Sequence, residues 1–122
     1  MGSTTRIGIA DDDAFTRASL NFIVHLEPKL RVVAEDENGS EAVAMVKKHR
    51  PDIVLMGTRL PDINGIEATR IIFSKFPDTK VIVLTMHTDQ TYSYTALEAG
   101  ACHFLAKDCG IIHQGPRKPQ NW

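Results

Sequence analysis

Polar groups that could bind a metal ion and a phosphoryl group each follow a short apolar run of the chain. Asp11 and Asp12 come after the run RIGIA, Thr85 ends the run KVIVLT, and Lys107 follows HFLA. Two carboxylates suit Mg²⁺, a hard cation that takes oxygen ligands and keeps several waters. A hydroxyl and an ammonium suit the oxygens of a phosphoryl group. These residue types predict phosphoryl transfer to a carboxylate between the metal and the lysine, whereas Asp13 is better placed to cap the next helix.

The carboxylate that this chemistry needs is missing. The stretch PDIVLMGTRLPDING, residues 51–65, ends its apolar run at Gly57, and glycine has no side chain that could accept a phosphoryl group. Thr58 and Asp62 are the nearest alternative acceptors, but neither occupies the position directly after the run. Gly57 could instead be an ordinary turn residue, since glycine tolerates strained backbone after a strand.

The segments that must position these residues alternate between short β-branched runs and longer amphipathic stretches. Five apolar runs with helical periodicity between them predict an α/β domain with a parallel sheet and right-handed crossovers. Ligands of such a sheet bind beyond the carboxyl ends of its strands, where the polar groups fall. We expect strands at 6–10, 30–35, 53–56, 80–85 and 103–106, and helices at 14–26, around 42–46, and at 64–75 and 91–99.

The pattern should continue with a fifth helix after Lys107, and the sequence does not provide one. Residues 109–122 (CGIIHQGPRKPQNW) lack a sustained helical period, and Pro116 and Pro119 would each break a helix. We therefore expect a domain over residues 4–108 and an irregular tail over 109–122, with the fifth helix missing.

The length, net charge and cysteine content of the chain restrict its possible partners and its cellular compartment. The 122 residues suit one domain, and a net charge of −1 disfavours a nucleic-acid binder. No run approaches the roughly 18 apolar residues of a membrane span, and two cysteines without a disulfide framework favour the cytoplasm. Zinc is disfavoured, because no tight pair occurs among Cys102, His103, Cys109 and His113.

Four motifs carry a family resemblance: IADDD, PDIVLMGTRLPDINGIEATR, VIVLTMHTDQTY and EAGACHFLAKD. In this order and at this spacing they resemble the receiver domain of bacterial two-component response regulators. They are most similar to the NarL/LuxR-type regulators, which carry a DNA-binding helix-turn-helix domain downstream. The resemblance covers residues 6 to about 108. It implies a flavodoxin-like fold with strand order 2-1-3-4-5 and a sensor histidine kinase as partner.

The resemblance also implies a role for individual positions. It makes Asp11 and Asp12 the acidic pair, Thr85 the hydroxyl, Phe104 the aromatic switch, Lys107 the lysine, and Gly57 the occupant of the phosphoacceptor position. Ordinary aspartyl phosphorylation then cannot occur. Mg²⁺ would keep only Asp12, Asp11 through water and the backbone carbonyl of Arg59, and its binding should weaken because hard-cation affinity follows ligand charge. Lys107 would pair with Asp12.

Two interpretations follow from these residues. In the first, the chain is a degenerate receiver, not an enzyme, which acts through protein contacts. In the second, it is an ordinary Mg²⁺-dependent phosphoacceptor that uses a substitute residue, or Gly57 is an incidental or engineered change. Without a fifth helix, part of the sheet should be uncovered, so we expect a homodimer through the face of the fourth helix and fifth strand.

Overall fold

The computed structural model describes residues 4–58, 60–85 and 103–106, and its elements alternate between strands and helices as predicted. All four strand pairings are parallel, and they join five strands in the order β2-β1-β3-β4-β5. This order confirms the flavodoxin-like fold class. The elements are β1 (Thr5–Ala10), α1 (Ala14–His25), β2 (Leu30–Asp36), α2 (Gly39–His49), β3 (Ile53–Gly57), α3 (Gly65–Lys75), β4 (Lys80–Thr85) and β5 (His103–Ala106).

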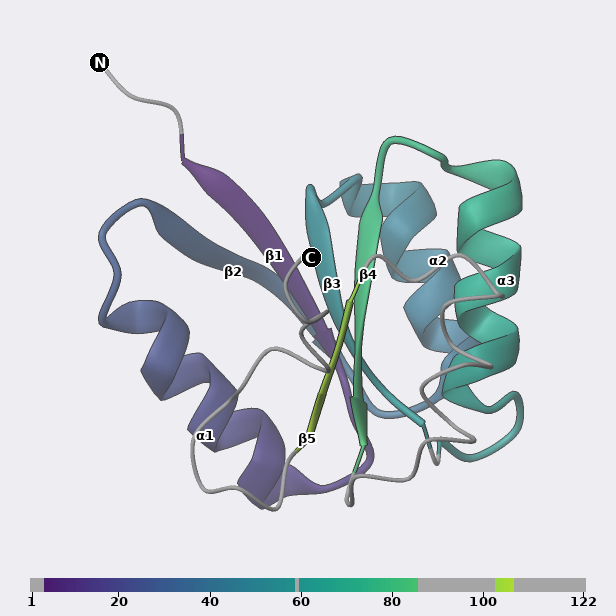
Figure 1. Cartoon of the computed structure of the whole chain (residues 1–122), viewed down its shortest axis with the longest axis horizontal. Coiled ribbons are helices and arrows are strands. Elements are labelled where there is room, and N and C mark those ends of the chain that lie inside the picture. Colours follow the sequence, from purple (N-terminus) through teal and green to yellow (C-terminus); the bar gives the residue numbers. More distant parts are fainter. Residues whose placement is uncertain (1–3, 59, 86–102, 107–122) are drawn as a thin grey trace, which may run out of the picture.

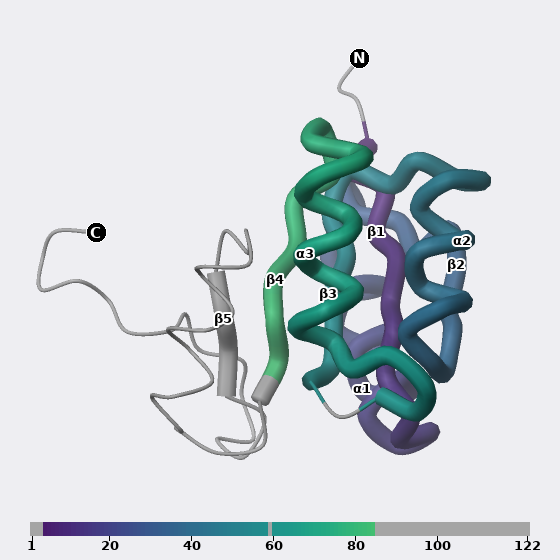
Figure 2. Tube along the Cα trace, turned by 90° about the vertical axis from the view of Figure 1, so that its right-hand side faces the viewer, coloured from purple at the N-terminus to yellow at the C-terminus, as the bar shows by residue number. Residues whose placement is uncertain are grey.

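The described helices cover both faces of the sheet. Figure 1 shows α1 on one side and α2 with α3 on the other, and Figure 2 shows the sheet between these layers. Successive residues of a strand point to opposite faces, so each central strand feeds two cores. One core lies under α1 and contains Ile7, Ile9, Leu20, Val24, Leu55 and Leu84. The other lies under α2 and α3 and contains residues such as Met45, Val54, Met56, Ile72 and Val83.

Each helix begins at a polar side chain that caps it. The carboxylate of Asp13 accepts from the Thr16 N–H at 3.2 Å, which confirms the predicted cap of α1. The amides of Asn38 and Asn64 do the same for α2 and α3, at 2.8 and 2.9 Å. Such caps satisfy N–H groups that have no partner inside the helix. They fix where each helix leaves the carboxyl edge of the sheet.

Several sequence predictions lie outside the described residues. The fourth helix at 91–99, the tail at 109–122 and the missing fifth helix all fall there, and they stay predictions. The strand at 103–106 is present as β5 and pairs with β4. Strand β3 extends to Gly57, one residue further than expected, so this glycine is the last residue of the strand.

Candidate functional site

The parallel register places the predicted site residues along one edge of the sheet. Ala10 of β1 is paired with Met56 of β3, so the next residues along the two strands, Asp11 and Gly57, lie side by side. Gly57 is paired in turn with Leu84 of β4. Thr85 ends the next strand, opposite Ala106. The structure therefore brings the backbones of these positions together, as the sequence predicted.

Asp11 is the most enclosed acidic residue at this edge. Its side chain is buried, with 1% of the residue exposed. The Asp13 N–H donates to the Asp11 Oδ1 at 2.9 Å, and the Asp11 N–H donates to the Asp36 carbonyl at 3.1 Å. These contacts hold the Asp11 carboxylate against the end of the sheet.

Gly57 faces this carboxylate directly. A Cβ added to Gly57 would lie 2.6 Å from the Asp11 Oδ2 and 3.2 Å from its Cγ. Contacts under 3.0 Å essentially never occur for real Cβ atoms, so a side chain here requires the Asp11 carboxylate to move. The space that a side chain at position 57 would enter is thus taken by Asp11.

Arg17 is a site residue that the sequence did not single out. Its Nη1 donates to the Asp11 carbonyl at 2.8 Å, and its Nε and Nη2 lie 3.8 and 4.0 Å from carboxylates of Glu35 and Glu37. The guanidinium therefore joins the end of β1 to the end of β2. The sequence signal that could have indicated this role of Arg17 is the pair of acidic residues at the end of β2, Glu35 and Glu37.

Asp12 offers its carboxylate to solvent, next to the buried Asp11. In the described residues no group of three or more acidic, histidine or cysteine side chains is placed to hold a metal ion. Position 57 contributes no carboxylate to this edge, because it is a glycine.

The loop after β3 is held tightly to the start of α3. The Gly65 N–H donates to the Thr58 carbonyl at 3.0 Å. A Cβ on Gly65 would lie 1.7 Å from the Gly57 carbonyl oxygen, so only glycine fits there. Thr58 is itself buried, with 7% exposed. This close approach explains the glycine that closes the motif at residue 65.

Asp62, one of the alternative acceptors considered above, binds the start of α2, which Asn38 caps. Its backbone has φ 61°, and its Oδ1 accepts from the N–H groups of Gly39 at 3.1 Å, Ser40 at 3.3 Å and Ile63. The Ser40 side-chain hydrogen bond, helped by these backbone bonds and opposed by partial desolvation, lowers the pKa of Asp62. Its carboxylate is therefore engaged at the start of α2.

Asp36 ends β2 beside this cluster. Its Oδ2 is buried and makes no hydrogen bond within the described part of the chain. Burial raises the pKa of Asp36, the charge of Glu41 raises it further, and His49 partly offsets both. Burial, and to a lesser extent the charge of Glu41, therefore make the ionised form of Asp36 costly.

Four positions of the predicted site cannot be described by their side chains. Arg59 and Lys107 lie outside the described residues, and only the backbones of Thr85 and Phe104 are placed, in β4 and β5. The predicted pair of Lys107 with Asp12 and the switch role of Phe104 therefore stay predictions.

Comparisons with known proteins identify the class of domain that this fold and edge define. The profile of the response regulator receiver domain family matches residues 7–113. The chain belongs to this family, whose members receive signals in two-component systems.

Its relatives include several transcriptional regulators. The chain is 41% identical over 103 residues to the transcriptional regulatory protein DegU of Brevibacillus brevis, covering 84% of this chain and 44% of that protein. It is 38% identical over 114 residues to a protein-glutamate methylesterase/protein-glutamine glutaminase of Pyrococcus horikoshii, covering 92% of this chain and 31% of that protein. The chain thus spans less than half the length of these relatives.

Solved structures show the same fold. The response regulator domain of Thermotoga maritima CheB matches with a TM-score of 0.81 and 34% identity, over 86% of this chain and 79% of that one. The receiver domain of the NarL regulator from Mycobacterium tuberculosis matches with a TM-score of 0.84 and 29% identity, over 88% of this chain and 86% of that one.

Among the residues that the structure describes, every helix is too short or too polar to span a bilayer.

Proposed function

We propose that this chain is a degenerate receiver domain that takes no phosphoryl group at position 57 and works through protein–protein contacts. The observation that carries the proposal is the arrangement of Gly57 and Asp11. The last residue of β3 has no side chain, and the Asp11 carboxylate occupies the space in front of it. A nucleophile is therefore absent at the place where the family resemblance puts the phosphoacceptor.

In this proposal the other residues of the phosphoryl pocket are present. Asp11 and Asp12 form the acidic pair, Thr85 and Lys107 contact the phosphoryl oxygens in ordinary receivers, and Phe104 is the switch. A ligand shifts a conformational equilibrium only through its different affinity for the two states. Without a phosphoryl group at position 57, Thr85 and Phe104 gain no new partner, so phosphorylation drives no switch.

In this proposal the chain binds Mg²⁺ more weakly than a receiver that has an aspartate at position 57. Asp12, Asp11 through water and the Arg59 carbonyl would hold it, and it would supply charge that neutralises a phosphoryl group. Loss of one of three charged ligands lowers affinity for a hard cation. Asp11 is also engaged by the Asp13 N–H, which supports a reduced affinity.

The partners follow from the relatives. We propose a cytoplasmic, non-enzymatic regulator that contacts a sensor histidine kinase or another protein and forms a homodimer. A role in transcription regulation is supported by relatives named as transcriptional regulatory proteins. We retain residues 4–108 as the receiver domain and 109–122 as its tail, with direct contacts to neither nucleic acid nor membrane.

The second interpretation, a substitute acceptor, has less support in the geometry. Thr58 is buried, and the Asp62 carboxylate is held by the start of α2. The Thr58 side chain is therefore enclosed, and the Asp62 carboxylate already has partners at the start of α2.

Phosphorylation with a small-molecule donor separates the two interpretations. We would incubate the whole chain with Mg²⁺ and acetyl phosphate and record its intact mass. The degenerate receiver gains no phosphoryl group. A stoichiometric gain would contradict the proposal, and Thr58→Val and Asp62→Asn variants would then show which residue carries the adduct.

A further inference from the structure

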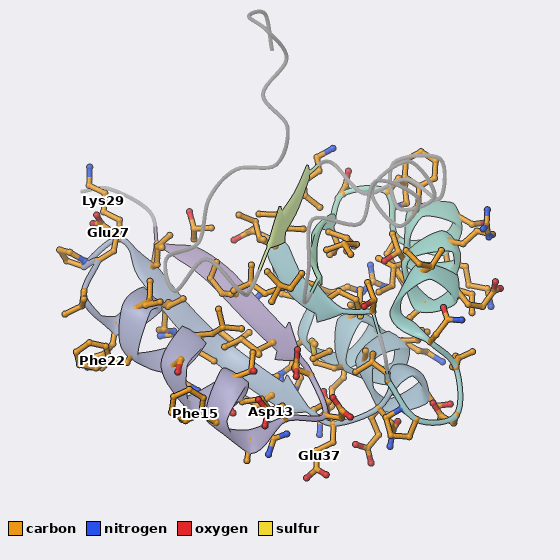
Figure 3. All side chains as sticks on the ribbon, turned by 60° about the horizontal axis from the view of Figure 1, so that its bottom comes forward. Asp13, Phe15, Phe22, Glu27, Lys29 and Glu37 are labelled. Carbon is orange, nitrogen blue, oxygen red and sulfur yellow. The ribbon has the colours of Figure 1, made fainter. Side chains whose placement is uncertain are left out.

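The charged side chains of the described residues are divided between the two edges of the sheet. The strands begin and the helices end at the edge opposite Gly57, which we call the amino edge. Eight of the ten described lysines and arginines lie there, at the starts of β1, β2 and β4 and the ends of α2 and α3, whereas nine of the twelve described carboxylates lie toward the other edge. Figure 3 shows Lys29 and Glu27 far from Asp13 and Glu37.

Three arginines from different elements meet at the amino edge. Arg6 and Arg31 are direct partners in the register of β1 and β2, so their side chains point to the same face of the sheet. That face is covered by α2, because a Cβ on Gly8, two residues after Arg6, would lie 2.7 Å from the Met45 side chain. The Arg6 Nη1 donates to the Arg50 carbonyl at 2.8 Å. The three arginines therefore form one group, which we call the arginine cluster.

Most donors of the arginine cluster have no partner within the described part of the chain. Arg50 is held in place by its Nε, which donates to the Lys47 carbonyl at 3.2 Å, and by the Phe76 ring, whose centroid lies 4.9 Å from its guanidinium carbon. Cations at a helix C-terminus also stabilise the helix, which accounts for the bond from Arg6. A guanidinium has five N–H donors, however, and Arg6 and Arg50 each use one. Among the described residues, none of the three arginines forms an ion pair, and Arg31 and Arg50 are exposed.

We propose that the amino edge binds a carboxylate-rich segment of a partner protein, and that the arginine cluster holds its carboxylates. The planar guanidinium presents two parallel N–H groups, which match the two oxygens of a carboxylate. Arginines whose positions are already fixed lose less side-chain freedom on binding. The site lies at the opposite edge from Gly57, so it does not depend on whether position 57 takes a phosphoryl group.

The carboxylates of the amino edge favour an acidic protein segment over a nucleic acid. Glu27, Asp52 and Asp78 lie among the cations, and all three are exposed. The Asp52 Oδ2 accepts from the Arg6 N–H at 2.8 Å, so a negative charge lies beside the arginine cluster. A nucleic acid presents a regular row of phosphates and would be repelled there. A polypeptide can place a carboxylate against each arginine and an N–H or a cation against Asp52, so that the charges on the two surfaces match.

Fluorescence anisotropy of a fluorescein-labelled peptide of about ten glutamates, titrated with the whole chain, tests the site. The peptide should bind saturably at about 50 mM salt and at least about tenfold more weakly at about 300 mM, because salt screens exposed charges. Arg31→Gln should weaken binding at least about fivefold. Arg70→Gln is the matched control, since it removes the same charge from an exposed arginine on α3, whose Nε lies 3.6 Å from Glu67. It should bind within about twofold of the wild type.

An unbound peptide, or an equal loss in Arg31→Gln and Arg70→Gln, would overturn the proposal. Thermal melts confirm that both variants are folded, since both side chains are exposed. Amide chemical shifts locate the contact: the peptide should shift residues 29–31 and 47–52 and leave 11–17 unchanged, and the reverse pattern would contradict the site. A single strand of about ten thymidines should bind at least about threefold more weakly than the peptide, and tighter binding of the strand would overturn the choice of an acidic protein.

Discussion

Replacing Gly57 with alanine measures how firmly Asp11 occupies the space in front of β3. The new Cβ would lie 2.6 Å from the Asp11 Oδ2, and an ordinary contact begins at 3.4 Å, so the carboxylate must retreat by about 0.8 Å. That movement breaks the hydrogen bond from the Asp13 N–H to the Asp11 Oδ1, now 2.9 Å long. A hydrogen bond to a charged group contributes about 1.5–3 kcal/mol.

An opposing gain comes from the backbone. Gly57 lies in a strand and not in the left-handed region, so alanine fits its conformation and stabilises by about 0.5–1 kcal/mol. We expect Gly57→Ala to lower the free energy of unfolding by about 1–2 kcal/mol. In an Asp11→Ala background the clash is gone, and the same change should stabilise by about 0.5–1 kcal/mol.

Urea unfolding followed by circular dichroism gives the four free energies of this cycle. The two changes should couple by about 2 kcal/mol, because the side chains would compete for one space. If Gly57→Ala stabilises the wild type as much as it stabilises Asp11→Ala, then the Asp11 carboxylate does not fill this space and the reasoning is wrong.

Three further predictions concern the same edge of the sheet. Gly65→Ala should destabilise by about 3 kcal/mol or more, because its Cβ would lie 1.7 Å from the Gly57 carbonyl oxygen, and a chemical melt that shows less than 1 kcal/mol would contradict this close approach. Asp62→Asn should lower the melting temperature at pH 7. Because the folded pKa of Asp62 is lowered, its contribution is present above the usual carboxyl range and is lost as pH falls through the folded pKa, so the melting curves of variant and wild type should converge in acid. Asp36→Asn should do the opposite: the folded pKa is raised, so ionised Asp36 costs stability that appears as pH rises above the usual carboxyl range, and the variant should gain stability at pH 7 but not at pH 3–4. Equal effects at both pH values would exclude ionisation as the cause for either residue.

Within the described residues, most of the fold could be predicted from the sequence, since its signals are local. The runs RIGIA, IVLM and KVIVLT gave three central strands, because strands covered on both faces are continuously apolar. The cap at Asp13 was also correct, as aspartate before an amphipathic run is a frequent N-cap. The order of the strands came from the family resemblance.

The contacts within the site could not be predicted in the same way. They join residues far apart in the sequence, such as Arg17 with Glu35 and Glu37, and Asp62 with the start of α2. The position of Asp11 in front of Gly57 depends on a side-chain rotamer that the sequence does not encode locally. Absence of a side chain at position 57 was visible from the sequence, but what fills the space was not.

The most direct test of the central claim compares the wild type with Gly57→Asp after incubation with Mg²⁺ and acetyl phosphate, by intact mass. The wild type should stay unmodified. Gly57→Asp should gain one acid-stable, base-labile phosphoryl group once Asp11 has moved aside, provided that Asp11, Asp12, Thr85 and Lys107 form the pocket. A phosphoryl group on the wild type at the extent seen with Gly57→Asp would contradict the account.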